Sequence, residues 1–130
     1  MLAVRMVRLY ADEAGETHFA DDEFDFALVD FSPASPALEV SETYDAKQFV
    51  VVRIAGDWSA QWHPSPQRQI WIGLEGTIRV TASDGETRDI PPGQPWLMED
   101  IEGRGHVTTA GGRPAIGAVT LLGSRERPDD

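Results

Sequence analysis

Short stretches in which apolar and polar residues alternate run along most of this chain. In residues 24–31, for example, Phe24, Phe26 and Leu28 occupy alternate positions and Asp25 lies between the first two. Alternation of this kind is the period of a half-buried strand. Apolar residues at helical spacing never extend beyond about two turns. The pattern therefore predicts an all-β protein.

Glycine- and proline-bearing turns separate the predicted strands. The strands are expected at residues 4–10, 24–31, 48–54, 61–63, 70–74, 77–81, 96–99, 105–109 and 115–122. Residues 32–45 contain two prolines and no clear period, so we expect a loop that crosses or covers the body, and we place His18 in a polar turn. About eight to ten short strands at regular spacing are typical of a closed barrel or a sandwich.

Length and charge narrow the class of protein. The 130 residues fit one domain, expected at 1–122 with its motif-bearing core at 48–109, followed by a polar tail at 123–130. A net charge of −11 would repel the phosphates of nucleic acid, so we expect no nucleic-acid partner. The first ten residues hold no apolar run long enough for a signal peptide or membrane span, which favours a cytoplasmic protein with no membrane partner.

Two stretches carry recognisable spacing. The first has glycines at either end and amide or imidazole side chains between them, at Gly56, Gln61, His63, Gln69 and Gly76. The second holds Gly85, Pro91 and Gly93. Together they resemble the two motifs of the cupin superfamily, and the runs 62–76 and 99–106 also resemble small single-domain bacterial cupin-like proteins. The resemblance implies a cupin-type β-barrel, that is, a double-stranded β-helix or jelly roll, and a homodimer.

The resemblance also implies where a metal site would lie. Metal-binding cupins bring three histidines and a carboxylate to one ion, and the matching positions here hold Gln61, His63, Gln69 and Trp96. A neutral amide is a poor donor to a divalent ion and an indole offers no lone pair. With no cysteine in the chain either, we expect a degenerate site with no metal and no cofactor.

Strand parity predicts the contents of the barrel. Alternate residues of a strand point to one face, which places inside the barrel Gln61, His63, Gln69, Trp71, Trp96, Met98 and Asp100. Trp58 and Trp62 fall outside this set. Flat apolar walls with a few directional polar groups are typical of a small-molecule pocket. The alternative is a filled core in which the tryptophans pack in place of a metal.

Three kinds of residue could carry chemistry. His63 can exchange protons with a ligand near neutral pH, although it could equally be a core histidine bonded to an amide. Asp100 can orient His106, or can instead accept backbone N–H groups of the following glycine-rich turn. Arg53 could anchor a substrate carboxylate if it points inward, or lie on an exposed sheet face.

These residues leave the function open between three hypotheses. The first is small-molecule binding in the barrel, with or without metal-independent acid–base chemistry of an isomerase, cyclase or lyase type at His63. The second is a divergent metal-dependent enzyme that uses His63 and His106. The third is a non-catalytic structural or regulatory module. The sequence does not identify a substrate or decide whether the chain is an enzyme.

Overall fold

The computed structural model describes residues 2–30 and 32–123, and within them the regular elements are all strands. The strands are β1 Arg5–Ala11, β2 Thr17–Glu23, β3 Ala27–Val29, β4 Leu38–Val40, β5 Ala46–Ile54, β6 Gln69–Glu75, β7 Ile78–Ala82, β8 Thr87–Ile90, β9 Pro95–Met98, β10 His106–Thr109 and β11 Ala115–Leu122. The all-β fold class is confirmed. No part of the described chain forms a helix that could cross a bilayer.

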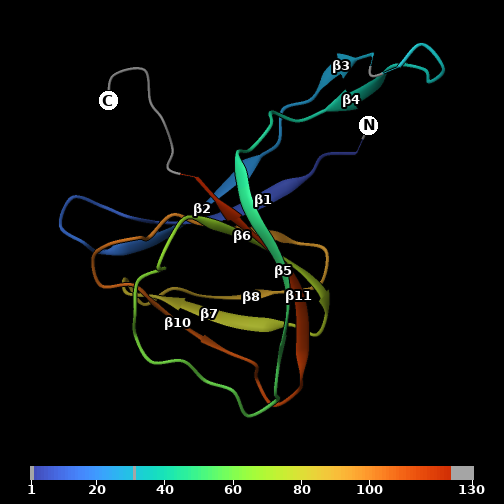
Figure 1. Cartoon of the computed structure of the whole chain (residues 1–130). Coiled ribbons are helices and arrows are strands. Elements are labelled where there is room, and N and C mark those ends of the chain that lie inside the picture. Colours follow the sequence, from blue (N-terminus) through green and yellow to red (C-terminus); the bar gives the residue numbers. More distant parts are fainter. Residues whose placement is uncertain (1, 31, 124–130) are drawn as a thin grey trace.

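Two sheets face each other and enclose the core. The larger has six strands in the order β2-β1-β9-β6-β11-β5, and the smaller has three in the order β10-β7-β8 (Figure 1). Both sheets contribute to one buried apolar cluster, for example Leu9 and Trp96 from the larger and Val80 and Ile90 from the smaller. The inner faces of the two sheets therefore bound the space where a site can form.

The apolar pattern explains which strands lie at the centre. β9 is buried at all four positions because β1 and β6 flank it, with β1 parallel and β6 antiparallel to it. β11 lies between β5 and β6 and alternates, so that Ala115, Gly117 and Val119 are buried at every second position. A strand in the middle of a sheet needs apolar residues on its inner face, and both sequences supply them.

The predicted strand at 24–31 is wrong in extent. Only Ala27–Val29 is a strand, and it pairs with Leu38–Val40, which lies inside the segment expected to be a loop. This β3–β4 hairpin projects from the two-sheet body (Figure 1), and Leu28 is 71% exposed. The alternation of residues 24–31 therefore does not mark a strand packed on the core of this chain.

The N-terminal region holds a strand that the apolar pattern does not predict. β2 is acidic and pairs antiparallel with β1 along its whole length, from Arg5 opposite Glu23 to Ala11 opposite Thr17. His18 therefore lies in a strand and not in a turn, which corrects the prediction. Backbone pairing at a sheet edge does not require apolar side chains, so the apolar pattern carries little signal for β2.

Most of the other predicted strands coincide with observed ones to within two residues, and 115–122 matches fully. The short strand expected at 61–63 is absent, since only His63 pairs there, as an isolated bridge with His106. β8 also went unpredicted. The tail expected at 123–130 lies outside the described residues from position 124 onward.

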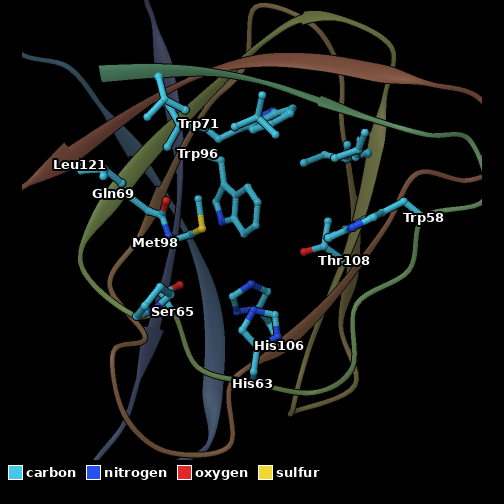
Figure 2. Close-up of a pocket in the computed structure, with 16 residues that line it drawn as sticks. Trp58, His63, Ser65, Gln69, Trp71, Trp96, Met98, His106, Thr108 and Leu121 are labelled. Carbon is cyan, nitrogen blue, oxygen red and sulfur yellow. The ribbon is translucent and has the colours of Figure 1, made fainter. Parts of the chain in front are cut away.

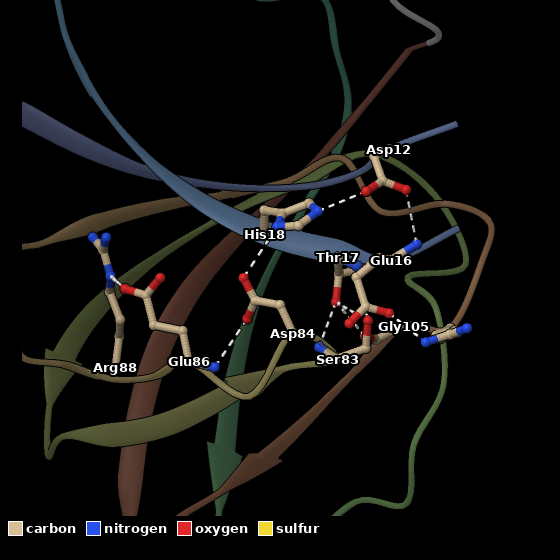
Figure 3. A network of polar contacts seen from close by, with 10 residues as sticks. Asp12, Glu16, Thr17, His18, Ser83, Asp84, Glu86, Arg88 and Gly105 are labelled. Atoms are coloured by element: carbon tan, nitrogen blue, oxygen red, sulfur yellow. Dashed lines mark hydrogen bonds and ion pairs between the residues drawn. The ribbon is translucent and has the colours of Figure 1, made fainter. Parts of the chain in front are cut away.

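Thr17 joins the two sheets at one end. Its hydroxyl donates to the carbonyl of Gly105 at 2.8 Å and accepts the backbone N–H of Ser83 at 2.7 Å, while its own N–H donates to the Ser83 hydroxyl at 2.8 Å (Figure 3). The Thr17 side chain is fully buried. These bonds hold Gly105, and with it the start of β10, against the larger sheet.

Candidate functional site

A cavity of about 310 Å³ lies between the inner faces of the two sheets (Figure 2). Its wall is mostly aliphatic and aromatic, with a few polar side chains that carry no fixed charge. The lining residues are Val50, Val52, Ile54, Trp58, His63, Ser65, Pro66, Gln69, Trp71, Ile78, Trp96, Met98, His106, Thr108, Val119 and Leu121. Small-molecule sites in proteins have this size and this mixture of groups. The cavity is the candidate site.

His106 is the most constrained polar group of the cavity. Its Nδ1 lies 2.6 Å from Oδ2 of Asp100, and the hydroxyl of Ser65 donates to Oδ1 of the same carboxylate at 2.8 Å. The Asp100 side chain has no exposed surface and His106 is 3% exposed. A carboxylate that accepts from Nδ1–H fixes the tautomer and leaves Nε2 as the acceptor nitrogen. Nε2 is therefore the nitrogen available to a molecule in the cavity.

His63 brings a second imidazole to the same end of the cavity. Its backbone pairs with that of His106 through two hydrogen bonds, and the two ring centroids are 5.3 Å apart. Its Nδ1 lies 2.7 Å from the carbonyl oxygen of Gln61, which again leaves Nε2 unprotonated in the neutral ring. Unlike His106, His63 is exposed and lies at the border of the cavity.

Two buried indoles form the wall facing the histidines. The Trp96 ring meets the His106 ring edge to face, with centroids 5.5 Å apart, and stands in the middle of the view in Figure 2. Trp71 lies across Gly117, where any Cβ would overlap the indole ring. Neither indole N–H has a hydrogen-bond partner among the described residues, although both nitrogens are buried. A buried donor without an acceptor is costly, which makes these two groups unusual.

The structure brings together most of the residues that the sequence placed inside the barrel. His63, Gln69, Trp71, Trp96, Met98 and His106 all line the cavity. Asp100 lies behind His106 and holds it, so the pairing of a carboxylate with His106 is present. Within the described residues, the Asp100 carboxylate is bonded to the His106 ring and the Ser65 hydroxyl and not to a backbone N–H.

Two predicted ligand-binding residues do not line the cavity. Gln61 is exposed, because the segment 61–63 is not a strand and its spacing of two does not place both side chains on one face. Arg53 is exposed on β5, where the alternation turns Val52 and Ile54 inward and Arg53 outward. An Arg53 anchor for a substrate carboxylate inside the barrel is therefore wrong.

Sequence reasoning missed the other ten lining residues, of which Trp58, Ser65 and Thr108 are the ones with a polar side-chain group. Trp58 lines the cavity, although strand alternation places it outside the barrel interior. The alternation rule does not apply to Trp58 because this residue belongs to a long loop and not to a strand. Ser65, between two prolines, and Thr108, on β10, were not singled out. The alternation of residues 105–109 would have found Thr108, since it shares a face with His106. Nothing local marks Ser65, whose role depends on Asp100, 35 positions away.

The donor set does not fit the four-ligand metal site of the resembled family. His63 and His106 are the only imidazoles of the wall, Gln69 offers an amide, and Trp96 occupies a further ligand position with an indole. Within residues 2–30 and 32–123, no three His, Asp or Glu side chains cluster closely enough to hold a metal ion. We therefore derive no step through a metal.

Comparison with known proteins identifies the architecture. No family model matches the chain, and no curated protein matches it. The solved structure of the DMSP lyase DddQ from Ruegeria pomeroyi matches with a TM-score of 0.52 at 21% identity, over 78% of this chain and 49% of DddQ. The chain has the cupin fold. This confirms the fold that the glycine motifs implied.

Two other solved structures resemble this chain. A cupin-2 domain protein from Shewanella frigidimarina has a TM-score of 0.48 at 20% identity, over 64% of this chain and 76% of its own. The cupin domain of Cnp3 from Schizosaccharomyces pombe has a TM-score of 0.43 at 14% identity, over 93% and 84%. Likeness at these identities concerns the fold, and a shared fold does not imply a shared reaction. The function has to be argued from the cavity.

Proposed function

We propose that the cavity of this cupin binds a small molecule and that His106 exchanges a proton with it as a general acid–base. The observation that carries the proposal is the buried Asp100 carboxylate 2.6 Å from Nδ1 of His106, with the ring itself lining the cavity. The reaction class is proton abstraction or return, as in isomerisation, cyclisation or elimination.

The pair has the geometry that a general base requires. Asp100 fixes the ring orientation and the tautomer, and Ser65 keeps the carboxylate in place through its second oxygen. A base held in one orientation loses little conformational freedom when it reacts, and general bases contribute about 10²- to 10⁴-fold to a rate. The imidazolium formed after proton abstraction remains beside the Asp100 carboxylate, which stabilises it.

His63 can serve as the partner acid or base. Its ring lies beside that of His106, so a proton taken by one imidazole can be returned by the other at a neighbouring position of the bound molecule. This modifies the sequence-based hypothesis, in which His63 was the principal base. The buried and carboxylate-paired His106 is better held than the exposed His63.

Elimination of 5-nitrobenzisoxazole tests the proposal without knowledge of the natural substrate. This flat neutral molecule loses its C3 proton to a base, the C–H electrons form a nitrile, the N–O bond breaks, and a coloured nitrophenolate appears. We expect the cupin to exceed free imidazole at equal concentration, and His106→Ala to lose at least about 10²-fold of that excess. His18→Ala, which removes a surface imidazole, is the matched control and should keep the rate.

The alternatives predict other outcomes. A rate that disappears with a chelator and returns with a divalent ion would favour the divergent metal enzyme built on His63 and His106. A cupin no faster than free imidazole, or a His106→Ala variant as fast as wild type, contradicts acid–base chemistry at His106. Failure of 5-nitrobenzisoxazole to bind at all would favour the non-catalytic module.

A further inference from the structure

The segment between β2 and β5 crosses the outer face of the six-stranded sheet. β2 and β5 are the two opposite edges of that sheet, so the chain passes from one edge to the other between them. At the two ends of the crossing, Phe24 and Tyr44 pack against a small apolar cluster formed by Met6, Leu97 and Leu122. The β3–β4 hairpin lies between these two anchors and projects away from the body (Figure 1).

The hairpin is apolar but is not covered by its own chain. Each of its strands has three residues, and within the described part of the chain the two strands pair only with each other. Phe26, Leu28 and Leu38 are 42–71% exposed. An isolated two-stranded hairpin is at best marginally stable in water. An apolar surface that covers these side chains would therefore stabilise the hairpin.

The outer face beside β5 offers such a surface. The pairing register places Val51 of β5 opposite Ala118 of β11, and Ala118 opposite Ile72 of β6, so one apolar row runs across three strands. Phe49 and Leu74 lie on the same face at alternate positions of β5 and β6, and both are more than half exposed. The anchors Phe24 and Tyr44 leave this part of the face open to solvent.

The hairpin and β5 carry opposite charges. Strand β5 has no acidic residue, and its Lys47 and Arg53 are exposed and form no ion pair within residues 2–30 and 32–123. Residues 25–42 contain no Lys or Arg, and their acidic residues are Asp25, Asp30, Glu39 and Glu42. Complementary charge favours contact of a hairpin with β5, and like charge disfavours contact of two hairpins or of two β5 strands.

We infer that two copies of this chain associate, with the β3–β4 hairpin of each copy packed on the outer face of β5, β11 and β6 of the other. A two-fold arrangement makes this contact twice, which doubles the apolar area that it buries. The alternate positions of β5 line the cavity through Val50, Val52 and Ile54, so the association also supports a wall of the candidate site. The main competing occupant of the face is the hairpin of the same chain.

Sedimentation of the full chain over a range of concentrations tests the association. We expect wild-type dimers that dissociate on dilution. Leu28→Glu on the hairpin and Val51→Glu on the sheet each place a charge in the contact, and each should raise the dimer dissociation constant by at least roughly 10-fold. Ile101→Glu is the matched control, because Ile101 is a similarly exposed apolar residue in the loop after β9. It should dimerise like the wild type.

Mixing the two variants tests which surfaces meet. In a heterodimer of Leu28→Glu and Val51→Glu, the unaltered hairpin of one chain packs on the unaltered face of the other, so one of the two contacts is intact. We expect the equimolar mixture to associate at a concentration at which each variant alone is monomeric. A dimer formed face to face would leave Leu28→Glu dimeric, and a dimer formed hairpin to hairpin would leave Val51→Glu dimeric.

A cross-link in the wild-type chain decides the question without a variant. Lys47 is the only lysine of the chain, and a carbodiimide joins its amine to a nearby carboxylate. In a mixture of ¹⁴N- and ¹⁵N-labelled chains, we expect peptides in which Lys47 of one label is linked to an acidic residue of the 25–42 segment of the other label. Mass spectrometry identifies these mixed peptides.

Each contrary outcome is distinct. A wild-type chain that stays monomeric at every concentration, or cross-links from Lys47 to the 25–42 segment only within one label, would overturn the association and favour packing within one chain. A variant that dimerises like the wild type, or a mixture that does not associate, would overturn the contact of hairpin with sheet. The rate assay with 5-nitrobenzisoxazole tests the proposed acid–base function separately from all of these outcomes.

Discussion

Asp100 shows how much a single side chain decides in this protein. Its carboxylate is fully buried and is held by two donors, the Ser65 hydroxyl at 2.8 Å and the His106 ring at 2.6 Å. A carboxylate buried away from water is destabilising unless its oxygens accept hydrogen bonds from the protein. The local stability of the chain and the orientation of the candidate base therefore depend on the same group.

Removal of one donor tests this dependence. Ser65→Ala leaves Oδ1 of Asp100 buried without a partner, and we expect the free energy of unfolding to fall by about 1–3 kcal/mol. Urea unfolding followed by tryptophan fluorescence measures the change. Ser59→Ala, at an exposed serine of the same loop, should change stability by less than about 0.5 kcal/mol. Equal effects of the two substitutions would contradict a structural role for the Ser65–Asp100 bond.

At the scale of elements, the contact between the 55–68 loop and β10 places the two histidines. Gly105 immediately precedes β10 with φ of 76°, and a Cβ there would overlap the backbone of His63. The absence of a side chain lets His63 and His106 pair through their backbones. One glycine thus allows a loop without regular structure to reach the site.

Gly105→Ala should separate the loop from β10. We expect both lower stability, by more than about 1–2 kcal/mol, and loss of the 5-nitrobenzisoxazole rate. Gly85→Ala is a matched control, because Gly85 also has positive φ, at 96°, but nothing lies within 4 Å of its Cβ position. Gly85→Ala should lower the free energy of unfolding only by the cost of positive φ at alanine, and it should keep the 5-nitrobenzisoxazole rate. A Gly105→Ala variant that behaves like Gly85→Ala would show that the close approach is unimportant.

At the scale of the whole molecule, His18 links the two sheets on the surface. Its Nε2 lies 2.7 Å from Asp12 in the β1–β2 turn, and its Nδ1 lies 3.0 Å from Asp84 in the β7–β8 turn (Figure 3). Both nitrogens face carboxylates, so only the imidazolium donates to both. The hydrogen bond to Asp12, followed by that to Asp84, raises the pKa of His18 above its ordinary value.

The raised pKa makes this link dependent on pH. Because the folded-state pKa lies above the unfolded one, the stabilisation is complete below about pH 6.5 and is lost as the pH rises through the folded-state pKa. The wild type should therefore exceed His18→Gln in melting temperature at pH 5.5, and the difference should shrink by pH 8.5. Thermal unfolding of both proteins at both pH values measures it. A difference that grows with pH would contradict the assignment.

The outer face of the six-stranded sheet exposes apolar side chains on the two strands that flank β11. Phe49 and Val51 on β5, with Ile72 and Leu74 on β6, are 39–66% exposed. Large exposed apolar side chains on one sheet face favour an interaction site. The homodimer expected from the family resemblance stays a prediction, and this face is the surface that we expect it to bury.

The sequence predicted the central elements well and the site only in part. β6, β7, β9 and β11 carry strong apolar patterns because they face a core, and all were predicted to within two residues. Gln69, Trp71, Trp96 and Met98 followed from strand parity. The alternation rule placed Gln61 inside the barrel wrongly, because residues 61–63 do not form a strand. It also mispredicted the packing of residues 24–31, because the β3–β4 hairpin projects from the body (Figure 1).

The sequence alone determined the all-β class, which follows from local periodicity, and its resemblance to the cupin motifs implied the cupin fold. The identity of the residues at the four motif positions also follows from the sequence alone. Only the tertiary structure decided that Asp100 holds His106, that Ser65 completes the pair, and that the Trp96 N–H has no partner. Those contacts join a loop, a strand end and a second sheet. Hydrogen bonds between segments far apart in the chain depend on how those segments pack, and no local pattern records that packing.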